Sequence, residues 1–265
     1  MQNRYVGDIG DYGKFALLRA LSAIKGDSLR LGIVWCLFPD EGHNSDGKYI
    51  SYLNKGHLRD LDTSLHDQLK HLVVHQNRTV AAIAESELFR SDTIFFDAPT
   101  LVPDVKGLPS PDERVQYRSR WLEQCLEMTS GCNFVFFDPD NGLETPSVDK
   151  RNLKAGKYIF WDELTPFVDR GQSLVVYHHL NRTASVAEQV NALGRLFKEK
   201  FTDADKILPL IYRRGSCRVF WVVANGSLAS ELDAIISGFL DTGWRGHFEI
   251  PCGFTVGSSN VIGKV

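Results

Sequence analysis

The chain has 265 residues, 43% of them hydrophobic and 24% charged, a composition typical of a globular protein. The formal net charge of −3 argues against a molecule that attracts nucleic acid through its overall charge, although a local basic groove stays open. The sequence contains no apolar stretch long enough for a transmembrane helix, and its first residues lack a signal-peptide core. Five dispersed cysteines favour reduced thiols over a zinc site, so we expect a cytoplasmic protein with no membrane partner and no bound metal.

The first predicted helix follows a glycine-rich opening. Gly7, Gly10 and Gly13 are three residues apart, and apolar residues then continue at helical spacing through residue 24. We expect the first-turn amides of this helix, with Lys14 nearby, to be able to receive a phosphate or carboxylate. The glycines do not follow a strand, so the pattern is not a dinucleotide fingerprint, and a capped helix with a flexible approach explains it equally well.

Residues 31–38 form the next apolar run and predict a buried strand. Ligands bind at the carboxyl ends of the strands in open α/β sheets, so the polar residues that follow are candidates for a binding cleft. Oxygen ligands from this loop could also hold a divalent ion, and an ordinary surface loop is the simpler alternative. The candidates are Asp40, Glu41 and Asn44.

Residues 49–90 have helical patterns over 49–53, 65–73 and 80–89, and residues 94–97 predict a short strand. Four prolines lie in residues 98–112, which we interpret as a long surface loop or lid. The amphipathic helix predicted for residues 114–128 carries several arginines and Tyr117, a pattern that suits a nucleic-acid backbone or an ordinary solvated face. These arginines are Arg114, Arg118 and Arg120.

The stretch from Phe134 to Glu144 organises the chain. Its first four residues are apolar and predict a strand buried on both faces, which Pro139 ends. Three carboxylates and an amide follow at the carboxyl end of this strand, more than a turn requires, and we predict that they are catalytic. They are Asp138, Asp140, Asn141 and Glu144.

The rest of the chain alternates between helices and strands. We expect a helix or turn–helix pair over 157–170, a strand over 173–177, helices over 184–201 and 228–240, and an edge strand or a loose tail in 249–265. Residues 207–213 and 217–224 flank a glycine turn and predict a β-hairpin. The strand over 173–177 ends in Tyr177, His178 and His179, of which only one histidine can face a cleft, and Arg182 is a candidate phosphate or carboxylate partner.

These elements predict an α/β fold over residues 1–265: a single-domain, Rossmann-like, mostly parallel sheet with helices on both faces and a C-terminal antiparallel β-hairpin. This layout resembles the class I methyltransferase fold. The segment from Gly7 to Phe15 is similar to the G-N-x-A-D-x-x-K-H opening of the bacterial large-subunit rRNA adenine-N6 methyltransferases. Asp138-Pro139-Asp140-Asn141 stands where that family has its D-P-P-Y motif.

The resemblance implies a base-flipping enzyme that uses S-adenosylmethionine. The positions it carries over are Asp8, Asp11, Lys14 and Asp138. Two departures separate the chain from the family. Asp140 and Asn141 replace the second proline and the aromatic residue, and an acidic loop after residue 38 replaces the glycine-rich loop that holds the methyl donor.

The residues leave the reaction open. In methyl transfer to a nucleobase, Asp138 would accept a hydrogen bond from the exocyclic amine, Asn141 would hold a second edge, and the donor would lie over the strand that ends at residue 38, with Asp40 or Glu41 on its ribose. A DNA glycosylase would need no cofactor. It would use Asp138, Asp140 or Glu144 as the carboxylate and grip the base with Asn141, Tyr177 and a histidine.

A nuclease is a third hypothesis, with Asp138, Asp140, Glu144 and Asp40 around Mg²⁺ and Lys157 beside them. A binding module that kept the fold and lost catalysis is a fourth. Nucleic acid, DNA or RNA, is the expected partner in each enzymatic hypothesis, and both housekeeping RNA modification and defence against phage DNA are open settings.

Overall fold

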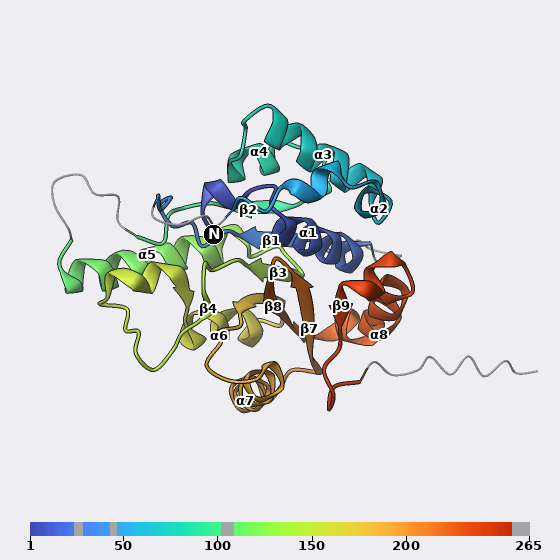
Figure 1. Cartoon of the computed structure of the whole chain (residues 1–265). Helices are drawn as coiled ribbons and strands as arrows, with labels where there is room; N and C mark the ends of the chain where they lie inside the picture. Colours follow the sequence, from blue (N-terminus) through green and yellow to red (C-terminus); the bar gives the residue numbers. More distant parts are fainter. Residues whose placement is uncertain (24–28, 43–46, 102–108, 256–265) are drawn as a thin grey trace, which may run out of the picture.

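The computed structural model describes residues 1–23, 29–42, 47–101 and 109–255, and a seven-stranded sheet forms the centre of this part of the chain (Figure 1). In spatial order the strands are β2 (Ile94–Phe96), β1 (Leu31–Val34), β3 (Phe134–Phe137), β6 (Ser173–His179), β8 (Ser216–Ala224), β7 (Lys206–Arg214) and β9 (Phe248–Glu249). A separate two-stranded sheet pairs β4 (Gly142–Leu143) with β5 (Tyr158–Ile159).

Strand direction brings several loops to one edge of the sheet. Strands β2, β1, β3 and β6 are parallel, and Val34, Phe137 and Val176 are neighbours in register, so the residues that follow them emerge together. Strand β8 is antiparallel to both β6 and β7, and it pairs Arg218 with His179. Because β8 runs in the opposite direction, its first residues and the turn before it reach the same edge.

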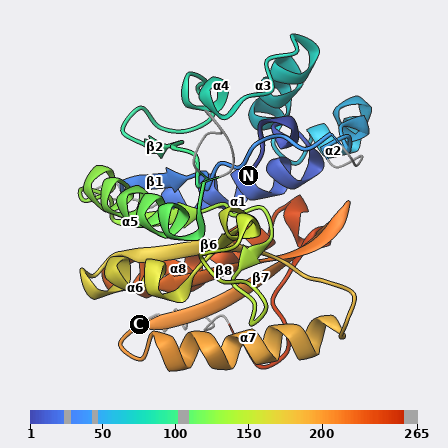
Figure 2. The same cartoon turned by 90° about the vertical axis from the view of Figure 1, so that its left-hand side faces the viewer.

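Helices cover both faces of the sheet (Figure 2). One face packs against α1 (Ile9–Ser22), α3 (Thr63–Val74), α4 (Val80–Ala84) and α8 (Gly226–Leu240). The other packs against α5 (Pro111–Met128), α6 (Trp161–Asp169) and α7 (Val186–Lys200). Each face of the sheet has its own hydrophobic core, and successive residues of a strand contribute to the two cores in turn. In β3, Phe134 and Phe136 belong to the core under α1, and Val135 and Phe137 belong to the core under α5.

The remaining elements are short. They are α2 (Gly56–Arg59) and the 3₁₀ helices η1 (Asn3–Tyr5), η2 (Ser51–Asn54), η3 (Leu153–Lys157) and η4 (Gly243–Gly246). No helix in the described ranges is long and apolar enough to cross a lipid bilayer.

The predicted α/β class, the mostly parallel sheet, the helices on both faces and the C-terminal hairpin are confirmed. The hairpin turns at Gly215, whose φ of 72° suits glycine. Strand β9 is the edge strand expected in the tail, and it pairs with β7, whereas residues 256–265 lie outside the described part.

Several predicted boundaries were wrong. Strand β1 ends at Val34 rather than at residue 38, and Cys36 turns the chain with a φ of 42°. Residues 49–53 contain a 3₁₀ helix, and α4 ends at Ala84 instead of residue 89. Helix α5 begins at Pro111, inside the predicted loop, because Ser110 and Glu113 form a capping box. Residues 102–108 of the predicted lid lie outside the described part.

Candidate functional site

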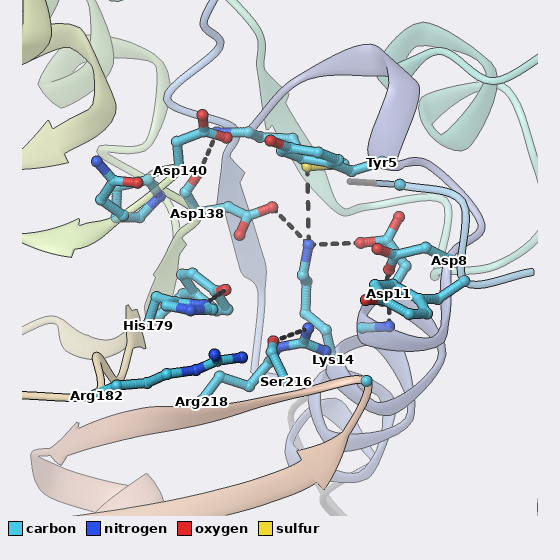
Figure 3. A pocket seen from close by; sticks show the side chains of 18 residues that line it. Tyr5, Asp8, Asp11, Lys14, Asp138, Asp140, His179, Arg182, Ser216 and Arg218 are labelled. Atoms are coloured by element: carbon cyan, nitrogen blue, oxygen red, sulfur yellow. Dashed lines mark hydrogen bonds and ion pairs between the residues drawn. The ribbon is translucent and has the colours of Figure 1, made fainter. Parts of the chain in front are cut away.

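A cavity of about 340 Å³ opens at the edge of the sheet where β3 and β6 end. The start of α1, the loop after β3, the end of β6 and the turn between β7 and β8 form most of its wall (Figure 3). Segments that are far apart in the sequence therefore meet around one space. The residues predicted from the sequence that line it are Asp8, Asp11, Lys14, Asp138, Asp140, Asn141, Tyr177 and Arg182.

Lys14 is at the centre of the wall. Its Nζ atom lies 2.7 Å from Oδ1 of Asp11 and 2.6 Å from Oδ2 of Asp138, and all three side chains are buried. Asp11 and Lys14 are three residues apart in α1 and share a face of that helix. Asp138 directly follows β3. The ammonium group thus joins the first helix to the central strand.

Burial and pairing act against each other in this cluster. Burial raises the pKa of Asp11 and of Asp138, and the positive charge of Lys14 opposes both shifts. Burial alone would lower the pKa of Lys14, but the attraction of the two carboxylates outweighs it and raises that pKa. The two carboxylates therefore favour the protonated form of Lys14, and Lys14 favours the ionised form of both carboxylates.

The glycines near the start of the chain do not form the anion-binding helix start that we predicted. Helix α1 begins at Ile9, so Gly10 and Gly13 lie inside it, where a Cβ atom would clash with Arg218 and Tyr212 of the hairpin. The predicted free first-turn amides are already bonded: Oδ1 of Asp8 accepts hydrogen bonds from Gly10 N at 2.7 Å and from Asp11 N at 3.0 Å. The glycines allow the hairpin to pack closely on α1.

A second polar network surrounds Asp140. Its Oδ2 atom accepts a hydrogen bond of 2.6 Å from Nε2 of Gln2, and the same amide lies 3.2 Å from Oε2 of Glu41. Nζ of Lys157 donates to Glu41 at 2.5 Å and lies 3.9 Å from Asp140. The structure thus brings Glu41 and Lys157 close to Asp140, next to the cavity rather than in its wall.

Two arginines make another part of the cavity wall basic. Arg218, at the start of β8, donates a 2.6 Å hydrogen bond from Nη2 to Oγ of Ser216, and Arg182 follows β6. In Figure 3 the labelled aspartates flank Lys14, with Asp138 and Asp140 to its left and Asp8 and Asp11 to its right, and both arginines lie below them. The cavity therefore has an acidic side, formed by α1 and the end of β3, and a basic side, formed by the end of β6 and the hairpin.

Glu144 and His178 are predicted residues at the strand ends that do not line this cavity. Glu144 accepts a hydrogen bond from the first amide of α6, Trp161 N, at 2.9 Å. His178 points away from the cavity, its Nδ1 accepts a hydrogen bond from Leu143 N, and burial lowers its pKa to about 4. His179, its neighbour in the strand, lines the cavity in its place.

The described acidic residues of the loop after β1, Asp40 and Glu41, do not line the cavity either. Asp40 is exposed and accepts a hydrogen bond from Arg4 N at 3.2 Å, and Asn44 lies outside the described residues. Main-chain groups at the predicted methyl-donor position already form hydrogen bonds with Met1. Met1 N donates to Cys36 O at 3.2 Å, and Phe38 N donates to Met1 O at 2.8 Å. The described residues after β1 therefore do not fit the donor as we predicted.

The predicted basic strip on α5 is not formed. Arg118 is buried and makes a two-point ion pair with Glu163, at 2.7 and 2.8 Å. Arg114 donates to the main-chain oxygens of Arg151 and Pro109, whereas Arg120 is exposed. Arg118 holds α5 against α6 and is not available to a nucleic-acid backbone.

Sequence reasoning missed several residues of the cavity wall. Two of them, Tyr5 and Tyr49, supply aromatic rings, and Ser216 and Arg218 come from the hairpin. One signal pointed to Arg218: it is a single charged residue directly before a run of six apolar residues in a predicted strand. No comparable pattern marks Tyr5, Tyr49 or Ser216.

No protein-family model, curated protein or solved structure matches the chain. In the described part of the chain, no three His, Cys, Asp or Glu side chains are grouped as ligands for a metal ion.

Proposed function

We propose that the protein cleaves the N-glycosidic bond of a nucleotide in nucleic acid and releases the base. The observation that supports this function best is the division of the cavity into an acidic and a basic side. Glycosidic cleavage develops positive charge on the sugar, which carboxylates stabilise, while the adjoining phosphates of the chain are negative. A cavity of about 340 Å³ is within the range of small-molecule sites and suits one nucleotide turned out of its stack.

Asp138 is the residue to which we assign the central role. Lys14 fixes its carboxylate at the cavity wall, and burial raises its pKa, which makes it a stronger proton acceptor than an exposed aspartate. In the proposed step the bond from C1′ of the sugar to the ring nitrogen breaks, and the base leaves with the electron pair. Water adds its hydroxyl group to C1′, and its proton passes by way of Asp138 to the base.

Other lining residues would bind the base. Asn141 offers both an amide donor and a carbonyl acceptor to the edge of a base. The rings of Tyr5 and Tyr49 line the cavity and can stack on a flat base. Tyr49 is 54% exposed although it is a large aromatic residue, which is consistent with a ring that a ligand covers.

A second candidate function is methyl transfer to a nucleobase. One observation favours it: Lys14 and Asp138, the two positions that the family resemblance carries over most readily, are 2.6 Å apart. The main chain after β1 is hydrogen-bonded to Met1, which argues against S-adenosylmethionine binding in the predicted place. Base excision needs no donor and is therefore the function that the described residues support better.

The test uses the full chain with DNA and RNA oligonucleotides that carry plain or modified bases. We expect alkali-sensitive abasic sites that form equally in the presence of EDTA. The variant Asp138→Asn should lose this activity, whereas Asp40→Asn, which changes an exposed aspartate outside the cavity, should keep it. EDTA-sensitive strand cuts would support the nuclease hypothesis instead, and methyl groups transferred from S-adenosylmethionine to the oligonucleotide would support the second candidate.

A further inference from the structure

The guanidinium group of Arg218 is buried without a full set of partners. The residue is 7% exposed, and Nη2 donates to Oγ of Ser216. Nε and Nη1 are buried, and neither has a hydrogen-bond partner among the described residues. Leaving charged donors unpaired in a protein interior is costly, so this arrangement indicates that an anion completes it.

The surroundings limit where that anion can bind. Arg218 lines the cavity on its basic side with Arg182 and Ser216. Burial acts to lower the pKa of Arg218, but nearby Tyr177, Asp8 and Asp11 outweigh it and raise that pKa. Neither aspartate forms an ion pair with Arg218 in the described structure. Both already accept hydrogen bonds from main-chain amides at the start of α1. A bound anion would thus lie toward Arg182 and Ser216.

Helix α1 fixes the position of this guanidinium. Nη1 lies against Gly10 in the first turn of α1, where a Cβ atom would clash with it. The hairpin register, which pairs Arg218 with His179 of β6, holds the other end of the side chain at the cavity. The two unpaired nitrogens are therefore held in place before a ligand binds.

We propose that Arg218, with Arg182 and Ser216, binds the phosphate of the nucleotide that occupies the cavity. The planar fork of an arginine matches the oxygens of a phosphate, and a serine hydroxyl can donate a further hydrogen bond. This proposal rests on the proposed function and defines its substrate class. The protein acts on a nucleotide that carries its phosphate, within a strand, and discriminates against the free nucleoside.

The experiment measures binding and does not require turnover. Isothermal calorimetry compares the common ribo- and deoxyribonucleoside 5′-monophosphates with the matching nucleosides, and inorganic phosphate serves as a competitor. We expect at least one monophosphate to bind about 10- to 100-fold more tightly than its nucleoside, and phosphate to displace it. Arg218→Met should abolish this difference. The matched control, Arg213→Met, removes an arginine of the same hairpin that pairs with Glu249 on the exposed surface, and should keep it.

Two further variants keep the test informative if Arg218→Met does not fold. Arg218→Lys keeps the charge but loses the fork, and Gly10→Ala keeps Arg218 but displaces Nη1. We expect both to bind the monophosphate more weakly than the wild-type protein does. Equal binding of nucleoside and monophosphate, unchanged binding by Arg218→Met, or no binding of any monophosphate at millimolar concentration would overturn the proposal. Failure of base excision alone would overturn only the proposed function, because phosphate binding is measured without it.

Discussion

Nζ of Lys14 lies 2.6 Å from Oδ2 of Asp138, although the two residues are 124 positions apart in the chain. Both side chains are almost completely buried. The pair connects the helix that begins the chain to the strand at the middle of the sheet, and it forms one wall of the cavity. The same contact is therefore expected to matter for stability as well as for function.

Replacing Lys14 by Met leaves Asp11 and Asp138 buried without their counter-ion. Removing one partner of a buried ion pair typically costs about 3–5 kcal/mol, and we expect the free energy of unfolding at pH 7 to fall by that amount. Without Lys14 the pKa values of both folded carboxyls rise further, so the deficit should shrink as the pH falls and the carboxyls take up protons. Urea unfolding at pH 7 and pH 5 measures both effects.

The triple variant Lys14→Met, Asp11→Asn, Asp138→Asn is the control for this prediction. It removes the charges together and should recover most of the lost stability. A single variant that stays within 1 kcal/mol of the wild type at pH 7 would contradict our account of the cluster.

We expect His178 to lower the free energy of unfolding at acidic pH. Burial lowers its folded pKa to about 4, while the unfolded value is about 6.5. Between these values the unfolded chain binds more protons, so the free energy of unfolding decreases as the pH falls from 6.5 to 4, by up to about 3 kcal/mol. His178→Asn keeps an acceptor for Leu143 N but does not titrate, and it should lose about 2–3 kcal/mol less than the wild type between pH 7 and 4.5.

Urea unfolding across this pH range provides the measurement. The wild type and His178→Asn share every other titrating group, so the difference between their curves isolates the one imidazole. Parallel curves would show that the pKa of His178 is the same in the folded and unfolded states, which would contradict the prediction.

Alanine substitutions at Gly142 and Gly238 are expected to have opposite effects on stability. Gly142 has a φ of 107°, and a Cβ atom there would lie 2.7 Å from Cα of His178, so Gly142→Ala should destabilise the protein by about 2 kcal/mol or more. Gly238 is inside α8 with open space around it, so Gly238→Ala should stabilise by up to about 1 kcal/mol. Thermal unfolding should therefore shift in opposite directions. A neutral Gly142→Ala would mean that β4 and β6 can separate at little cost.

Arg118 is expected to affect stability and not nucleic-acid affinity. Arg118→Gln removes the two-point ion pair and leaves the buried Glu163 with only the longer contact to Nζ of Lys150, at 3.6 Å, so it should cost up to about 3–5 kcal/mol. The double variant Arg118→Met, Glu163→Leu removes both charges and should recover much of this loss. Electrophoretic mobility of a labelled oligonucleotide should be the same for the double variant, for Arg120→Gln and for the wild type. Weaker binding by the double variant alone would restore a role for α5 in binding.

The acidic side of the cavity could be predicted from local patterns. Asp138 ends an apolar run before a proline, and Asp11 and Lys14 are one helical turn apart. Each feature depends on a few neighbouring residues. Parallel strands then bring their carboxyl ends to one edge, which the order of strands and helices implies.

The basic side of the cavity could not be predicted in this way, because it depends on strand pairing between residues that are far apart in the sequence. Arg218 reaches the cavity because β8 is antiparallel between β6 and β7 and pairs Arg218 with His179. A shift of one residue would point its side chain to the other face. Arg118, in contrast, could have been recognised as buried, since it shares a helix face with Trp121 and Cys125 at positions i+3 and i+7.

Helix α1 packs on α3, which follows it closely in the chain, and also on β7 and α8, which are formed by residues near the end. On a ribosome, about 180 further residues must be made before β7 is available, which takes roughly 10–40 s at usual rates of synthesis. During that interval one apolar side of α1 and the Lys14 cluster have no permanent cover. The nascent chain is therefore expected to depend on a chaperone that shields such surfaces, and to complete its cavity only after the hairpin has emerged.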